Sequence, residues 1–125
     1  MSVAHVLDAS AVLAYLQQEK GRERVETALA TAQCRMTAVN TCEVLGKLHE
    51  RGMPLAEAEA AFDGLAVSVV DFDSELAALA AALRPRTRRI GASLGDRACL
   101  ALAERLSRDS ASAVYTAERA WRRVT

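Results

Sequence analysis

Apolar and polar positions follow two different periods along this chain, which predicts alternating strands and helices. The apolar run over residues 3–7 stops abruptly at Asp8, which predicts a short buried strand that ends there. Ser10 is the expected N-cap of a helix over residues 11–18, where apolar side chains recur at helical spacing. Asp8 thus stands between a strand and a helix. In open α/β sheets this is where ligands bind, although a polar residue there can also simply end the strand and help cap the helix.

The same two periods predict the remaining elements. Further strands are expected over residues 33–39, 67–70 and 113–115, and further helices over about 22–31, 40–51, 55–65, 73–83, 93–106 and 116–121. The arginine-rich segment 84–91 is expected to interrupt the helices. Strands that alternate with helices predict an α/β fold with a mostly parallel sheet covered on both faces.

Length and composition fit a single domain of that class, spanning residues 1–125. Of the 125 residues 51% are hydrophobic, enough to bury a proper core. Lys and Arg (16) balance Asp and Glu (16), so the net charge does not indicate a nucleic-acid partner. Cys34, Cys42 and Cys99 lack metal-type spacing, which predicts reduced thiols in a cytoplasmic protein. The sequence contains no recognisable signal peptide or membrane span.

Four acidic residues stand at strand-to-helix junctions or helix starts. Asp8 ends a strand, and Glu43, Asp96 and Glu118 each fall in the first turn of a predicted helix. Local capping can account for each of them, because residues 40–43 and 93–96 both have the spacing of a capping box and first-turn acids gain from the helix dipole. A parallel sheet, however, would bring all four to the same edge.

If these acids share a cleft, their repulsion requires a counter-charge. At an effective dielectric of about 20, two charges roughly 5 Å apart cost about 3 kcal/mol, more than capping returns. A divalent cation relieves this repulsion, and carboxylate oxygens select Mg²⁺ or Mn²⁺. If the acids are instead spread along the edge, each bound to its own helix, no metal is needed. The charges alone leave both arrangements open.

Four segments of the chain resemble the motifs of PIN-domain proteins, most closely the VapC-type toxins of bacterial toxin–antitoxin pairs. These segments are Val6-Leu-Asp-Ala-Ser-Ala-Val-Leu-Ala, Val39-Asn-Thr-Cys-Glu-Val followed by Lys47-Leu48, Ser93-Leu-Gly-Asp-Arg-Ala-Cys-Leu-Ala-Leu-Ala103, and Tyr115-Thr-Ala-Glu-Arg-Ala-Trp121. The third is the most specific, and together they extend over essentially the whole chain. In the last motif the family normally ends Thr-Ala-Asp, whereas this chain has Glu118, which is one methylene longer.

The resemblance implies a three-layer α/β/α sandwich and a Mg²⁺- or Mn²⁺-dependent endoribonuclease. It assigns the acidic metal site to Asp8, Glu43 and Asp96. Glu118 is the fourth catalytic acid, and its extra methylene predicts an outer role in place of direct contact with the first ion. The supporting polar residues that it implies are Ser10, Asn40 and Thr116. Bound metal and carboxylates together would activate water and relieve charge on the phosphoryl and leaving oxygens.

The resemblance also implies partners: an RNA substrate, a cognate VapB-like antitoxin that blocks the cleft, and a second copy of the chain. Dimerisation is expected through the helices that contain Val44, Leu48, Leu55 and Phe62, although these residues can equally be core.

Arginines are the expected contacts for RNA phosphates. Arg97 beside Asp96 is the best-placed one, followed by Arg84, Arg86, Arg88 and Arg89; alternatively, these side chains form only a solvated surface. His5 and His49 form no pair with a serine, since the first falls in a strand and the second on the exposed side of its helix. Two other functions remain open, a PIN-like binding module with impaired catalysis and a metal-dependent phosphatase or DNA nuclease.

Overall fold

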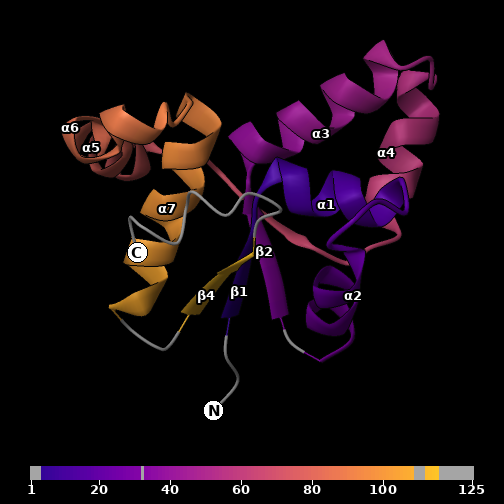
Figure 1. Cartoon of the computed structure of the whole chain (residues 1–125), viewed down its shortest axis with the longest axis horizontal. Coiled ribbons are helices and arrows are strands. Elements are labelled where there is room, and N and C mark those ends of the chain that lie inside the picture. Colours follow the sequence, from indigo (N-terminus) through magenta and orange to yellow (C-terminus); the bar gives the residue numbers. More distant parts are fainter. Residues whose placement is uncertain (1–3, 32, 109–111, 116–125) are drawn as a thin grey trace.

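The computed structural model describes residues 4–31, 33–108 and 112–115, and its centre is a four-stranded sheet (Figure 1). The strands are β1 (Ala4–Leu7), β2 (Gln33–Thr37), β3 (Ser68–Val70) and β4 (Ser112–Tyr115). The helices are α1 (Ala9–Leu16), α2 (Arg22–Thr31), α3 (Ala38–Glu50), α4 (Leu55–Asp63), α5 (Ser74–Ala82), α6 (Arg84–Thr87) and α7 (Leu94–Ser107), with a 3₁₀ turn η1 (Arg88–Ile90) before α7. The predicted alternation of strands and helices is confirmed.

All strand pairs are parallel, in the order β3-β2-β1-β4. The register pairs Leu7 with Tyr115 and Thr37 with Val70, so the last residues of neighbouring strands lie at one edge of the sheet. Asp8 follows β1 directly and α3 follows β2 directly at that edge. The parallel arrangement therefore brings together residues that are far apart in the sequence.

Helices cover both faces of the sheet, which confirms the three-layer α/β/α architecture. Val6 and Leu7 are adjacent and fully buried, and they face opposite sides because side chains alternate along a strand. Val6 packs in a cluster with residues of α5 and α7, whereas Leu7 packs in a second cluster with residues of α1, α2, α3 and α4. Figure 1 shows these two groups of helices on either side of the strands.

Several predicted boundaries are wrong by a few residues. Helix α1 begins at Ala9 with Asp8 as its N-cap, so Ser10 lies inside the helix. Helix α3 begins at Ala38 with Thr37 as its N-cap, so the helix starts before Asn40 and β2 ends before residue 39. In both places a side chain nearer the strand accepts the free backbone N–H three residues later, and the helix starts there.

The segment 84–91 is also more ordered than predicted, because it forms the short helix α6 and the turn η1 rather than a break. Thr87 stabilises this segment, since its buried hydroxyl donates to the Leu83 carbonyl at 2.9 Å. The predicted helix over 116–121 lies outside the described residues. Across the described helices, none has the length and apolar character that crossing a bilayer requires.

The residues considered for a dimer contact divide between core and surface. Val44, Leu48 and Phe62 are buried in the cluster around Leu7, whereas Leu55 at the start of α4 is 47% exposed. The first three therefore stabilise the fold itself, and Leu55 is the one left at the surface.

Candidate active site

Asp8 lies almost buried, 3% exposed, at the end of β1. Its Oδ1 accepts the Ala11 backbone N–H at 2.8 Å, which caps α1. The Ser10 hydroxyl donates to the same carboxylate at 2.9 and 3.0 Å. Ser10 therefore supports Asp8 as expected but does not cap the helix, and the carboxylate is fixed in orientation.

Asn40 is the polar centre of the α3 side, 1% exposed. The buried Thr37 hydroxyl donates to Asn40 Oδ1 at 2.7 Å and accepts the Asn40 backbone N–H at 3.1 Å. Asn40 Nδ2 donates to Glu43 Oε1 at 3.1 Å and to the Gly95 carbonyl at 3.0 Å. One amide thus ties β2, the acid of α3 and the first turn of α7 together.

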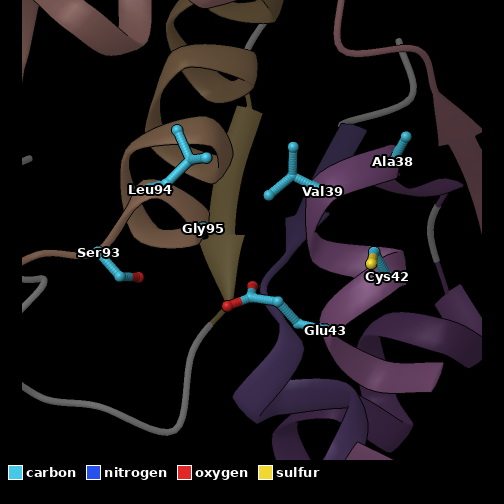
Figure 2. Close-up of a pocket in the computed structure, with 7 residues that line it drawn as sticks. All are labelled: Ala38, Val39, Cys42, Glu43, Ser93, Leu94 and Gly95. Carbon is cyan, nitrogen blue, oxygen red and sulfur yellow. The ribbon is translucent and has the colours of Figure 1, made fainter. Parts of the chain in front are cut away.

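Glu43 lies in the second turn of α3, not the first, and its carboxylate is directed toward the start of α7 (Figure 2). A Cβ at position 95 would overlap this carboxylate, so Gly95 leaves the space that Glu43 occupies. Burial raises the pKa of Glu43; the Asn40 hydrogen bond lowers the pKa, Asp96 raises it and Lys47 lowers it. The predicted capping box over residues 40–43 is wrong, because Thr37 provides the cap.

Asp96 forms the capping box predicted for residues 93–96. Asp96 Oδ2 accepts the Ser93 backbone N–H at 2.9 Å, and the Ser93 hydroxyl accepts the Asp96 N–H at 3.2 Å. The local interpretation of Asp96 is therefore confirmed. Capping leaves its negative charge in place beside Glu43, whose pKa it raises.

Cys99 is fully buried in α7, and the charges of the three described acids all act on its thiol. Burial raises the pKa of the Cys99 thiol well above its ordinary value, and the charges of Asp8, Asp96 and Glu43 raise it further. Asn40 joins Glu43 to Gly95, the residue before Asp96, and the charge of Asp96 raises the pKa of Glu43. Glu43 and Asp96 are therefore neighbours across α3 and α7, at the edge of the sheet where Asp8 follows β1.

The donor set fits a hard divalent cation, since it consists of carboxylate oxygens. Over the residues that the structure describes, no three His, Cys, Asp or Glu side chains are grouped tightly enough to bind one ion together as they stand. Mg²⁺ keeps several of its waters and takes only one or two carboxylates directly. One or two of the carboxylates of Asp8, Glu43 and Asp96 would fit such an ion directly, with the remaining contacts made through water. Glu118 and Thr116 lie outside the described residues.

Three further residues of this region are not among the predicted site residues: Thr37, Gly95 and Cys99. A Thr at the end of a predicted strand and the start of a helix is a local N-cap signal, which identifies Thr37. Gly95 and Cys99 have no such signal, because their roles depend on α3 and β1 packing against α7.

The candidate phosphate contacts are only partly grouped. Arg97 donates to the Ala80 carbonyl at 3.2 Å, which holds its guanidinium against α5. Arg84, Arg88 and Arg97 line one pocket, whereas Arg86 and Arg89 are exposed and do not line it. His49 is exposed, as expected, and its Nδ1 lies 2.9 Å from the Met53 carbonyl oxygen.

Comparison with known proteins identifies the fold. The model of the PIN domain family matches residues 5–125. The chain is similar in structure to the toxin VapC20 of Mycobacterium tuberculosis, described as cleaving the Sarcin-Ricin loop, with 15% identity, a TM-score of 0.75 and coverage of 95% of this chain and 93% of the toxin.

Two further solved structures are similar. For VapBC2 of Rickettsia felis, bound to a promoter DNA fragment, the identity is 12% and the TM-score 0.64, with 98% of this chain and 93% of the other covered. For PAE2754 of Pyrobaculum aerophilum the identity is 18% and the TM-score 0.63, with 100% of this chain and 88% of the other covered. No curated protein matches the sequence.

Proposed function

This chain belongs to the PIN domain family, and from that premise we propose that it is a metal-dependent endoribonuclease, the toxin of a type II toxin–antitoxin pair. The observation that carries the proposal is the Asn40 amide, which joins Glu43 to the first turn of α7 beside Asp96, at the sheet edge where Asp8 ends β1. Carboxylates gathered at one edge repel one another, and a divalent cation would offset this repulsion where capping alone does not.

In the proposed site, Asp8, Asp96 and Glu43 would hold Mg²⁺ or Mn²⁺, directly or through water. When bound, such an ion lowers the pKa of water and stabilises charge on phosphoryl oxygens. Asp8 is held ready by Ser10 and by the Ala11 N–H. Asn40 orients Glu43, whose raised pKa suits it to accept a proton from water at Oε2 while Oε1 keeps its hydrogen bond. Cys99 stays neutral and adds no charge beneath the acids.

The proposed partners are RNA, a VapB-like antitoxin and a second copy of the chain, all acting in the cytoplasm. Support comes from solved complexes of similar fold, which include VapBC of Salmonella typhimurium bound to DNA, at 14% identity and a TM-score of 0.61. A second supporting fold is that of a Klebsiella pneumoniae toxin–antitoxin complex, at 19% identity and a TM-score of 0.62. An active ribonuclease must be blocked in its own cell, which is the reason to expect an inhibitor.

The test is Asp8→Asn, which removes the charge and keeps the cap. Asn is as good an N-cap as Asp, so Ala11 and Ser10 keep a partner and the metal-free fold should be as stable or more so. Cleavage of single-stranded RNA with Mn²⁺ should be abolished. Single-stranded DNA and a small phosphoester should remain uncut by the wild type, which separates a ribonuclease from a DNA nuclease or phosphatase.

The matched control is Asp63→Asn at the exposed end of α4, which should leave cleavage unchanged. Asp8→Asn that cuts RNA at the wild-type rate would refute the metal site. A wild type that binds RNA and never cuts it would support the binding-module alternative instead.

A further inference from the structure

An apolar pocket of about 500 Å³ lies directly beside Glu43. Val39 and Cys42 of α3 line one side, Leu94 of α7 lines the other, and the Glu43 carboxylate closes one end, as Figure 2 shows. Leu94 is 50% exposed although it is a large hydrophobic residue. The pocket is therefore an apolar recess that opens from the acidic site, of the size of a small-molecule site.

A second pocket, of about 260 Å³, adjoins the first at the Ser93–Leu94 segment. Arg84, Arg88 and Arg97 line it, and none of its lining residues is acidic. The two pockets share Ser93 and Leu94 as lining residues. Along this surface, carboxylates, an apolar recess and a cationic recess thus follow one another.

This order matches the chemistry of a nucleic-acid strand, in which an apolar base face and an anionic phosphate alternate. Bases of single-stranded RNA can be turned out and packed against apolar side chains. Arginine guanidinium groups pair with phosphate oxygens in a planar, charge-assisted geometry. Resting on the proposed function, we propose that the pocket of Val39, Cys42 and Leu94 takes a base of the RNA strand and that the arginine pocket takes the adjacent phosphate.

The neighbouring arginines favour a nucleotide over an apolar protein side chain as the occupant. An apolar side chain would gain nothing from a cationic recess next to it. A base, in contrast, is always joined through its ribose to a backbone phosphate, which such a recess would bind. Duplex RNA cannot use the pocket, because its bases are stacked and paired. The strand is therefore expected to enter single-stranded and to pass over Ser93 and Leu94 on its way from the acids.

The test is fluorescence anisotropy in EDTA, which prevents cleavage, with two labelled probes: a single-stranded uridine octamer and an octamer of abasic ribose phosphates. Leu94→Ala should weaken binding of the uridine octamer about fivefold to tenfold, at the low end of what base stacking contributes, and leave the abasic octamer unchanged. Arg88→Ala should weaken the binding of both probes, and it should lower by about 1 the slope of the logarithm of the binding constant against the logarithm of salt concentration. Val69→Ala changes a similarly exposed apolar residue of β3 that lines neither pocket, and should change the binding of neither probe.

The outcomes separate this inference from the proposed function. If Leu94→Ala affects both probes equally, or neither, the base pocket is refuted while Asp8-dependent cleavage of RNA can still stand. If Leu94→Ala binds RNA normally but no longer binds the antitoxin, the pocket is a protein-binding site, and this result also overturns the inference. Failure of the wild type to bind or cut RNA would overturn both. Thermal unfolding of Leu94→Ala checks the fold, which should not change because the side chain is half exposed.

Discussion

Asn40→Ala should destabilise the fold far more than its single amide suggests. The substitution removes the acceptor of the Thr37 hydroxyl, 2.7 Å away, and the donor to the Gly95 carbonyl, 3.0 Å away. Both partners are buried, and leaving each unpaired costs about 1.5 kcal/mol. Alanine regains about 0.6 kcal/mol as the better helix former. The expected net loss is roughly 2–3 kcal/mol.

Urea unfolding at pH 7, followed by circular dichroism, measures this difference. For a chain of this length the loss corresponds to a fall in Tm of about 8–12 °C. Glu50→Ala, exposed on the same helix, is the matched control and should change stability by less than about 0.5 kcal/mol. Asn40→Asp should not rescue the fold, since a carboxylate accepts from Thr37 but cannot donate to Gly95 and repels Glu43.

A loss below about 1 kcal/mol for Asn40→Ala would refute this reasoning, because it would mean that water replaces the amide. Wild-type stability of Asn40→Asp at pH 7 would refute the claim that donation by Nδ2 holds α3 to α7.

The remaining predictions concern the acids. Gly95→Ala should change the free energy of unfolding by less than about 1 kcal/mol, because the gain in helix propensity offsets one lost hydrogen bond. It should nevertheless lower the rate of RNA cleavage at least about tenfold, because the new Cβ displaces the Glu43 carboxylate. Unchanged cleavage would contradict this prediction. Because the folded chain binds the Glu43 proton more tightly than the unfolded chain does, stability falls as pH rises from the ordinary pKa of 4.5 to the raised one. Glu43→Gln should therefore stabilise the metal-free fold at pH 7 and not at pH 4, as urea titrations at both pH values would show. Glu118→Asp should keep RNA cleavage within about tenfold, whereas Glu118→Gln should lower metal affinity, so that added Mn²⁺ restores part of the rate.

The sequence alone determined the layers of this fold and most of its elements. Apolar spacing with periods of two and 3.6 is a local property, and it located the strands and helices to within a few residues. The capping box at Ser93 was predictable for the same reason, since both its hydrogen bonds join residues three apart. The sequence pattern also predicts Asp8 at a strand end and Asp96 in a first helical turn, whereas Glu43 lies in the second turn of α3 and not in the first.

Only the tertiary structure decided what those acids do together. Asn40 has the same three-residue spacing to Glu43 as Ser93 has to Asp96, yet the box does not form there, because Thr37 ends β2 and caps α3 first. The Asn40 amide then reaches Gly95, 55 residues away, which no local pattern can encode. The packing of the Glu43 carboxylate against Gly95 likewise depends on how α3 lies against α7. A sequence specifies neighbours along the chain, whereas contacts between distant elements are set when their apolar faces pack into a common core.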